Sequence, residues 1–184
     1  TTGDDDVIIA ILDTGVSEHV EFNGRLLEGY DFINNDTDAY DDNGHGTACA
    51  GIAAAKGNNS EGIAGVCWDC LIMPIKVLSF DGYGQDTEIA DGVQWSADNG
   101  ANVISMSLGG NPGFRFFGQS TDESENAVQD ALDAGIFVIA AAGNDGGPDD
   151  DGDVESPGSI PGVICVGGHD RFGEIWEGSS MGDN

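Results

Sequence analysis

Basic side chains are scarce in this 184-residue sequence, which has five lysines and arginines against 34 aspartates and glutamates and a formal net charge of −29 at pH 7. The phosphate backbone of DNA or RNA would repel such a chain, so the sequence predicts no nucleic-acid partner. The self-repulsion is relieved when salt screens it or cations bind. The acidic residues therefore have two explanations, a solvated surface suited to saline surroundings or specific calcium sites.

The acidic residues gather in three clusters, at residues 4–6, 36–42 and 149–155. These clusters fall mostly in segments that we expect to be loops, where charged side chains stay hydrated. We therefore interpret most of them as a solvated acidic surface.

Long hydrophobic runs are also missing. The longest apolar stretch, Gly135 to Gly143, is far too short to span a bilayer, and the chain does not open with the charged and apolar pattern of a signal sequence. The sequence thus predicts no membrane partner. Its length suits one α/β domain with a real core and is too short for two of ordinary size, and we expect a monomer.

Cysteine is sparse, with four residues in the chain. Cys67 and Cys70 form a Cys-Trp-Asp-Cys sequence, but no second cysteine or histidine pair stands at zinc spacing, so we expect no structural zinc. A local disulfide formed outside the cell and two free thiols both remain open. Cys49 and Cys165 lie in apolar segments that are typical of small buried residues.

The pattern of apolar and small residues along the chain predicts alternating strands and helices. Residues 7–12 form a continuous apolar run that ends at Asp-Thr-Gly, the pattern of a parallel strand buried on both faces. Residues 44–56 read as a helix of small residues that can pack close to a sheet. Further strands are expected over 71–78 (bent or at an edge at Pro74), 101–108, 136–142 and 163–167, and further helices over 86–99 and 122–134.

This alternation predicts an α/β fold of right-handed βαβ units with a mainly parallel sheet flanked by helices. In open sheets of this kind, sites form at the carboxyl ends of the strands. Those ends carry Asp13, the segment 107–109 and Asn144, while His45 opens a helix between two glycines. We therefore expect these residues to converge.

Four short motifs carry a resemblance to a known family. They are Asp13-Thr-Gly, Asn43-Gly-His-Gly-Thr, Ser105-Met-Ser-Leu-Gly-Gly and Ala140-Ala-Ala-Gly-Asn. In this order they resemble the motifs of the subtilisin-like serine peptidases, the subtilase family, and the likeness runs over essentially the whole chain. The resemblance implies a three-layer α/β fold and a serine endopeptidase that hydrolyses peptide bonds through an Asp-His-Ser triad.

The resemblance also implies residue roles. Asp13 is expected to accept a hydrogen bond from His45 and to stabilise its imidazolium form, while His45 takes the proton of a serine hydroxyl. Asn144 is expected to donate to the oxyanion that forms.

Substrate polypeptide is expected to bind as an added strand beside the segment 107–109, with residues 82–84 on its other side. The segment 140–143 would wall the pocket for the side chain before the cleaved bond. Because these walls are small and apolar, we expect a hydrophobic side chain there. The expected substrate-binding residues are Ser107, Leu108, Gly109, Ala142 and Gly143.

The nucleophilic serine is the one part of the triad that the motifs do not supply. Gly178-Ser-Ser-Met-Gly resembles the family's Gly-Thr-Ser-Met-Ala, but it follows Asn144 too soon and matches an earlier serine-rich stretch of the family better. We expect the nucleophile to lie beyond Asn184, so that residues 1–184 form a truncated, partial peptidase domain that is inactive by itself.

A calcium site is a further expectation from the resemblance. The loop over residues 56–62 resembles the metal loop of the family, with Asn59 and Glu21 as the expected ligands, although an ordinary polar loop remains an alternative. Cys49 resembles the thiol that some members carry under the histidine, and we expect it to pack rather than react. The resemblance further implies a secreted, extracellular enzyme, and the acidic composition predicts that this enzyme is salt-tolerant.

Two other functions remain open. One is a non-catalytic subtilase-like relative that keeps the scaffold for peptide binding. The other is an unrelated acidic, calcium-binding α/β protein, which predicts that Asp13 and His45 lie far apart.

Overall fold

The computed structural model describes residues 2–110, 123–147 and 152–182, and within them a six-stranded sheet runs through the molecule in the order β2-β3-β1-β4-β5-β6. All five strand pairings are parallel. The strands are β1 (Ile8–Asp13), β2 (Tyr30–Asp31), β3 (Leu71–Lys76), β4 (Val103–Met106), β5 (Phe137–Ala141) and β6 (Ile164–Val166).

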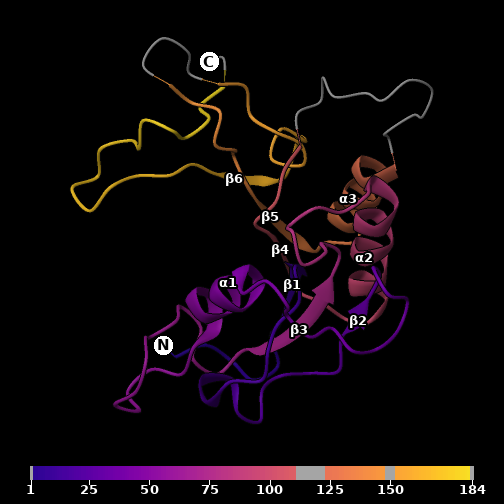
Figure 1. Cartoon of the computed structure of the whole chain (residues 1–184), viewed down its shortest axis with the longest axis vertical. Coiled ribbons are helices and arrows are strands. Elements are labelled where there is room, and N and C mark those ends of the chain that lie inside the picture. The colour runs from indigo at the N-terminus through magenta and orange to yellow at the C-terminus, as the bar shows by residue number, and fades with distance from the viewer. Residues whose placement is uncertain (1, 111–122, 148–151, 183–184) are drawn as a thin grey trace.

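Helices cover both faces of this sheet. Figure 1 shows α1 on one side and α2 and α3 packed together on the other. The predicted three-layer α/β arrangement with a mainly parallel sheet is therefore confirmed. The helices are α1 (His45–Ala54), α2 (Asp86–Asp98) and α3 (Glu123–Asp133), with a short 3-10 turn, η1 (Val20–Phe22).

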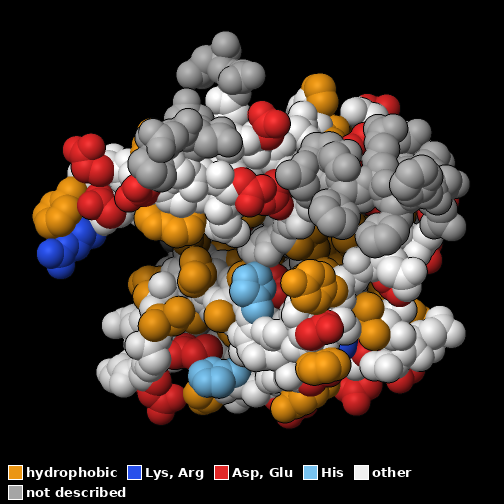
Figure 2. Space-filling view, turned by 45° about the horizontal axis from the view of Figure 1, so that its top comes forward, with side chains coloured by type: hydrophobic (Ala, Val, Ile, Leu, Met, Phe, Trp, Pro, Cys, Tyr) orange, Lys and Arg blue, Asp and Glu red, His pale blue; other side chains and the backbone are white. Residues whose placement is uncertain are grey.

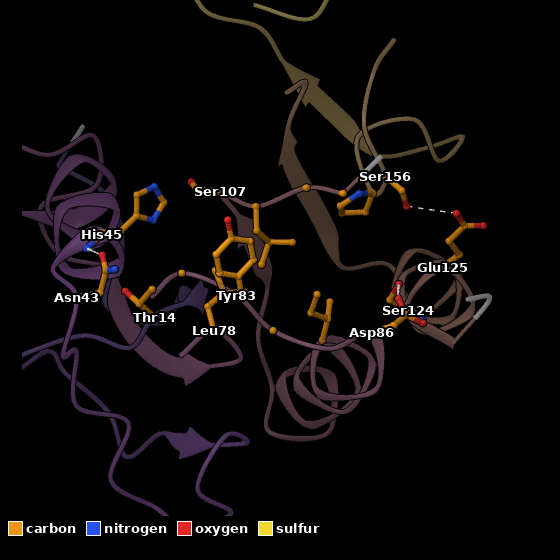
Figure 3. Close-up of a pocket in the computed structure, with 17 residues that line it drawn as sticks. Thr14, Asn43, His45, Leu78, Tyr83, Asp86, Ser107, Ser124, Glu125 and Ser156 are labelled. Atoms are coloured by element: carbon orange, nitrogen blue, oxygen red, sulfur yellow. Dashed lines mark hydrogen bonds between the residues drawn. The ribbon is translucent and has the colours of Figure 1, made fainter. Parts of the chain in front are cut away.

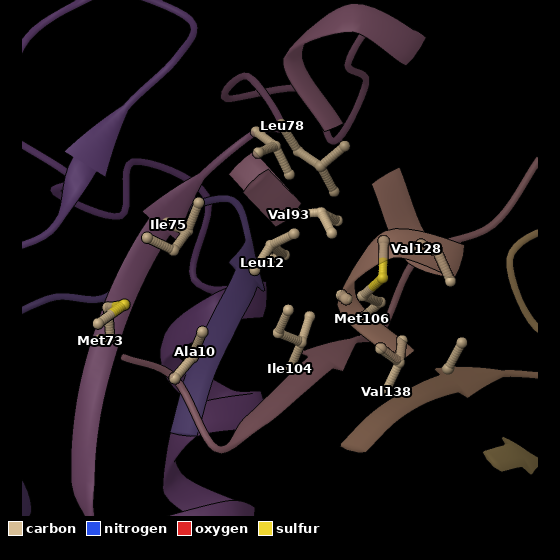
Figure 4. Packing of buried hydrophobic residues seen from close by; sticks show 14 residues of the cluster. Ala10, Leu12, Met73, Ile75, Leu78, Val93, Ile104, Met106, Val128 and Val138 are labelled. Carbon is tan, nitrogen blue, oxygen red and sulfur yellow. The ribbon is translucent and has the colours of Figure 1, made fainter. Parts of the chain in front are cut away.

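The continuous apolar run of β1 reflects its place in the middle of the sheet. Ala10 and Leu12 face the layer of α2 and α3, where they join a core that includes Val93 (Figure 4). Ile9 and Ile11 face the opposite layer, where they pack in one cluster with Ala50 and Ala54 of α1. Because alternate residues of the strand enter opposite cores, every position after Ile8 is buried.

The predicted elements lie where they were expected, to within a few residues at their ends. The sequence did not indicate β2 and η1, which are two and three residues long and too short for a periodic pattern. Pro74 lies inside β3, just before the two residues that pair with β2. The neighbouring strand β2 therefore does not extend as far as the proline. Asp122, expected in the helix that became α3, lies outside the described residues.

The structure decides between the disulfide and the free thiols that the sequence left open. Cys67 and Cys70 are joined by a disulfide, and Cys49 and Cys165 are free. The expectation that Cys165 is buried is wrong, because β6 is the last strand of the sheet and all three of its residues are exposed. None of the described helices is both long enough and apolar enough to cross a membrane.

Gly92 of α2 marks a close contact between helix and sheet. A Cβ atom on Gly92 would fall 2.5 Å from Cγ1 of Val77 and 3.1 Å from Cγ2 of Ile75. Both valine and isoleucine are stiff, buried side chains, so neither can move aside easily. The glycine is required for this approach of α2 to β3.

We predict that Gly92→Ala destabilises the protein by about 1–3 kcal/mol through overpacking. Gly51→Ala in α1 is the matched control, because its Cβ would meet only Cδ1 of Ile63, at 3.6 Å. There the better helix propensity of alanine should stabilise by about 0.5–1 kcal/mol. Urea unfolding followed by circular dichroism measures both, and two variants shifting in the same direction would contradict the packing argument.

Candidate active site

The carboxyl end of β1 and the start of α1 bring an acid and a histidine together. His45 Nδ1 lies 2.7 Å from Oδ1 of Asp13, and the backbone N–H of Thr14 donates to the same oxygen at 2.8 Å. The Asp13 side chain is 1% exposed, whereas that of His45 is 51% exposed. A buried acid thus orients a ring that remains open to solvent and to other molecules.

The contact also fixes which ring nitrogen of His45 carries the proton. A carboxylate can only accept hydrogen bonds, so Nδ1 donates to Asp13 and carries the hydrogen. In the neutral ring, Nε2 then has a free lone pair and can accept a proton. This is the arrangement required of a general base that is held in place by an acid.

A second buried acid, Asp41, ties the two elements to each other. Its Oδ1 accepts from the hydroxyl of Thr14 at 2.8 Å and from the backbone N–H of Gly44 at 2.8 Å. Its Oδ2 accepts from the backbone N–H of Thr47 at 2.9 Å and from the Thr47 hydroxyl at 2.6 Å. The N-cap residue, Gly44, has no side chain to cap the helix, so Asp41 caps α1 from outside it.

These hydrogen bonds determine the ionisation of Asp41. Burial alone would raise its pKa, but the hydrogen bonds from Thr47, Gly44 and Thr14 outweigh burial and lower the pKa from 3.8 to about 2. Asp41 is therefore a carboxylate at every pH at which proteins normally function.

Thr14 is also held from its other side by a buried lysine. Lys76, at the end of β3, is 2% exposed and donates from Nζ to the backbone carbonyl of Thr14 at 2.7 Å. It also donates to Leu78 O at 3.0 Å and forms an ion pair with Asp42 at 2.7 Å. Thr14, which follows the carboxyl end of β1, is thus held by Asp41 through its hydroxyl and by Lys76 through its carbonyl.

Gly46 allows the helix to begin directly against β1. A Cβ on Gly46 would lie 2.2 Å from the carbonyl oxygen of Gly15 and 3.0 Å from Cβ of Asp13. Any larger residue would push α1 away from the strand. The glycine after His45 is therefore explained by the short distance that the His45–Asp13 contact requires.

His45 opens onto a cleft with a volume of about 470 Å³. Figure 3 shows His45 and Ser107 at one end of it and Asp86, Ser124 and Glu125 at the other. The predicted substrate segments 107–109 and 82–84 both line it. Figure 2 shows a face hollowed across its middle, with a histidine in the hollow and far more acidic than basic side chains around it.

The remaining predicted residues lie at the end of β5. Ala142 is 3% exposed, Gly143 has a φ of 113°, and Asn144 is exposed at the turn that follows. The structure does not place these three among the residues lining the cleft around His45.

Glu155 lies at these predicted walls, which the sequence indicated to be apolar. Its backbone N–H donates to the carbonyl oxygen of Ala142 at 2.9 Å. A Cβ on Gly143 would fall 2.6 Å from its Oε1, and a Cβ on Gly109 would fall 2.4 Å from its Oε2. The expectation of purely apolar walls is therefore wrong, because the chain folds a distant glutamate between the two segments.

Ser179 and Ser180 are buried and already bonded. Ser179 Oγ accepts from the backbone N–H of Gly168 at 2.8 Å, and Ser180 Oγ accepts from that of Asp145 at 3.1 Å. Both hydroxyls therefore hold backbone in place.

Cys49 lies beneath the histidine, with Sγ 3.9 Å from His45 Nδ1. Burial raises the pKa of this thiol, which therefore stays protonated at neutral pH. The observation fits packing better than reaction as its role.

The predicted metal ligands Glu21 and Asn59 are in contact. Asn59 Nδ2 donates to Glu21 Oε2 at 2.8 Å, and Asn59 Oδ1 accepts from the backbone N–H of Glu61. Glu21 is 3% exposed, and its Oε1 has no hydrogen-bond partner among the described residues. Oε1 also points at Gly62, where a Cβ would lie only 2.2 Å away. A buried carboxylate oxygen without a partner fits a cation.

Comparison with known proteins assigns this geometry to a family. A sequence profile described as the Subtilase family matches residues 4–184. The chain belongs to the subtilase family. This subtilase is 40% identical over 183 residues to the "Thermophilic serine proteinase" of Bacillus sp. (strain AK1), across 99% of this chain and 43% of that protein. It is 47% identical over 139 residues to "Thermitase" of Thermoactinomyces vulgaris, across 75% of this chain and 47% of that protein.

A solved structure supports the same family. A cold-adapted subtilisin-like serine proteinase has a TM-score of 0.80 and 33% identity, across 100% of this chain and 63% of that one. The subtilase thus spans less than half the length of the two curated relatives named above.

Sequence reasoning did not find the residues that support the site. Asp41 lies in an acidic run that we interpreted as solvated, although an acid shortly before a glycine N-cap is a signal for a cap supplied from outside the helix. Lys76 gave a weaker signal, as a charged residue inside the apolar strand predicted over 71–78. Glu155 gave none, because its neighbours Gly109 and Gly143 are distant in the sequence.

We predict that Asp41→Asn lowers the free energy of unfolding by about 2 kcal/mol, because an amide cannot accept all the hydrogen bonds of the carboxylate. The low-field proton resonance of the His45 Nδ1–H should weaken, as α1 is no longer held against Thr14. The folded pKa of Asp41 lies below 3.8, so its stabilisation is fully present above pH 4 and is lost as pH falls toward 2.

The difference in stability between the two proteins should therefore shrink below pH 4. Asp38→Asn, at an exposed acid of the same loop, is the matched control and should change little. An Asp41→Asn protein with unchanged stability and an unchanged His45 resonance would contradict the role of Asp41.

Proposed function

We propose that this subtilase is the partial peptidase domain of a serine endopeptidase, in which Asp13 and His45 serve as the acid and the base of an Asp-His-Ser triad. The observation that carries the proposal is the 2.7 Å contact of His45 with a buried carboxylate, at the mouth of a cleft. The names of the relatives, both proteolytic enzymes, support it. If the chain were an unrelated calcium-binding protein, Asp13 and His45 would be expected to lie far apart, and they are instead in contact.

In this proposal the ring of His45 moves one proton twice. Nε2 takes the proton from a serine hydroxyl as it attacks a peptide carbonyl, and then gives it to the leaving amine. Asp13 keeps the ring in the correct tautomer and stabilises the imidazolium. The side-chain amide of Asn144 would donate to the oxyanion of the tetrahedral intermediate.

Polypeptide substrates would bind in extended form beside Ser107, Leu108 and Gly109. The exposed strand end and the facing segment 82–84 in the same cleft support a bound peptide pairing on both sides. Ala142 and Gly143 would then wall the pocket for the side chain that precedes the cleaved bond.

The nucleophile in this proposal is a serine that these 184 residues do not contain. Ser179 and Ser180 are unsuited, because both hydroxyls are buried in backbone contacts. The apolar side chains of Ile164 and Val166 on β6 are about half exposed, which suits a place where further chain packs. We propose that such chain carries the serine.

We predict that Asp13→Asn in the full-length product of the gene lowers kcat for peptide amides by about 10⁴-fold, because the amide favours the wrong tautomer of His45. His45→Ala should have an effect at least as large. Asp98→Asn, at an exposed acid of α2, is the control and should keep full activity.

Circular dichroism would show that the variants are folded. A wild-type protein that binds peptides without cleaving them would instead favour the non-catalytic relative. Variants of Asp13 or His45 that retain activity within tenfold of the wild type would exclude the triad.

We further propose that Glu21 and Asn59 hold a structural calcium ion. The partnerless Oε1 of Glu21 in a buried position supports a hard cation with oxygen ligands. When bound, calcium would neutralise the buried carboxylate and tie the loop over residues 56–62 to η1. The ion would then act on stability and would take no part in proton transfer.

We predict that calcium at a hundredfold excess over its dissociation constant stabilises the protein by about 2.7 kcal/mol. Glu21→Gln should remove this response, because it deletes the charge that faces Gly62. Glu18→Gln, at an exposed neighbouring acid, should keep it. Thermal unfolding with added calcium and with a chelator, together with calorimetric titration, measures both, and an unchanged response in Glu21→Gln would refute the site.

The surroundings of the protein also belong to this proposal. A disulfide between Cys67 and Cys70 persists in oxidising compartments, which supports secretion. The net charge of −29 supports function in saline surroundings, where salt screens the repulsion between acidic side chains. We propose a monomer that acts on polypeptides outside the cell.

A further inference from the structure

The segment 155–156 connects the two walls of the proposed substrate site. On one side, the N–H of Glu155 donates to Ala142 O at 2.9 Å. On the other, the carbonyl of Ser156 accepts from the N–H of Gly110 at 3.1 Å. The side chain of Glu155 is therefore carried on backbone that both walls hold in place.

Both oxygens of the Glu155 carboxylate lie against a glycine. Oε2 would be 2.4 Å from a Cβ on Gly109, and Oε1 would be 2.6 Å from a Cβ on Gly143. These two glycines belong to the two segments that were predicted, independently of each other, to bind substrate. The carboxylate fits because neither wall has a side chain there.

This carboxylate has no partner among the described residues, where none of the hydrogen bonds or ion pairs reaches its side chain. Glu155 is nevertheless partly buried. A half-buried carboxylate gains from a cation that comes within hydrogen-bond distance. The local geometry thus leaves an acid at a substrate wall with its charge unmatched.

We propose that Glu155 makes this subtilase select lysine or arginine at the substrate residue that precedes the cleaved bond. The inference rests on the proposed peptidase function. A basic side chain that enters between Gly109 and Gly143 meets the carboxylate and forms a charge-assisted hydrogen bond with it. An apolar side chain meets the same carboxylate and must desolvate it without any compensation.

The net charge of the whole chain also attracts basic peptides, so the test has to separate the two effects. Attraction by the overall charge raises association rates and falls steeply with salt. A contact at Glu155 acts on one substrate position and persists when salt is high. Glu28, an exposed acid on the segment before β2, does not line the cleft and provides a variant with the same change of net charge.

The experiment compares four peptide amides that differ only in the residue before the cleaved bond: arginine, lysine, leucine or glutamate. The full-length product of the gene is assayed as wild type, Glu155→Gln and Glu28→Gln, at low and at molar salt. We expect the wild type to prefer arginine and lysine over leucine in kcat/KM by about tenfold to a hundredfold, the size of a hydrogen bond to a charged group.

Glu155→Gln should lose this preference and Glu28→Gln should keep it, at both salt concentrations. Glu155→Asp, which retains the charge on a shorter side chain, should restore part of the preference. A Glu155→Gln protein that hydrolyses the leucine peptide at least as fast as the wild type shows that the variant is folded and active.

Two outcomes would overturn the inference. One is a wild type that prefers leucine, and the other is a preference for basic residues that survives in Glu155→Gln. In both cases the peptides are cleaved, so the proposed function stands. A wild type that cleaves none of the four peptides would count against the proposed function itself.

Discussion

The hydrogen bond from His45 to Asp13 joins residues 32 positions apart in the sequence, and the rest of the site depends on it. It forms because β1 lies between β3 and β4 and ends at Asp13, which is paired with Lys76 of β3. The helix that carries His45 starts at the same edge of the sheet. Neither residue would be unusual alone, since an acid in a turn and a histidine at a helix start are both common. Their contact gives the pair a chemistry that neither has by itself.

A rigid site also needs its supports fixed, and here the support is polar. Thr14 follows Asp13 directly and is held by Asp41 through its hydroxyl and by Lys76 through its carbonyl. Asp42 neutralises the lysine, so no buried charge in this group is left without a partner. Such networks are costly when incomplete and confer a single arrangement when every member is satisfied. The site is thus held by hydrogen bonds of defined length rather than by apolar contact alone.

Most of the fold could be predicted from the sequence, because burial on both faces leaves a continuous apolar run in β1 and small residues in α1. Asp13 and His45 were found because each stands at the boundary of such an element. The supporting charges were not, since an acid that folds inward, such as Asp41, resembles its solvated neighbours in a loop. The position of Glu155 depends on contacts between distant segments, which no local pattern records. Burial of a charge is decided by tertiary structure, and only its consequences for capping leave a local signal.

Because basic side chains are scarce in this chain, an acid without a partner indicates a cation that binds from outside. The guanidinium of Arg25 donates to backbone carbonyls, among them that of Ala54, and Lys56 and Lys76 pair with Asp69 and Asp42. Arg171 lies over the ring of Phe172. Of the five basic residues, these four are thereby engaged, and the fifth lies outside the described residues. In a chain with so few cations, a carboxylate oxygen without a described partner, such as Oε1 of the buried Glu21 or either oxygen of the half-buried Glu155, is best matched from outside. A metal ion suits the enclosed oxygen of the first, and the basic side chain of a bound peptide suits the second, which lies where a substrate would enter.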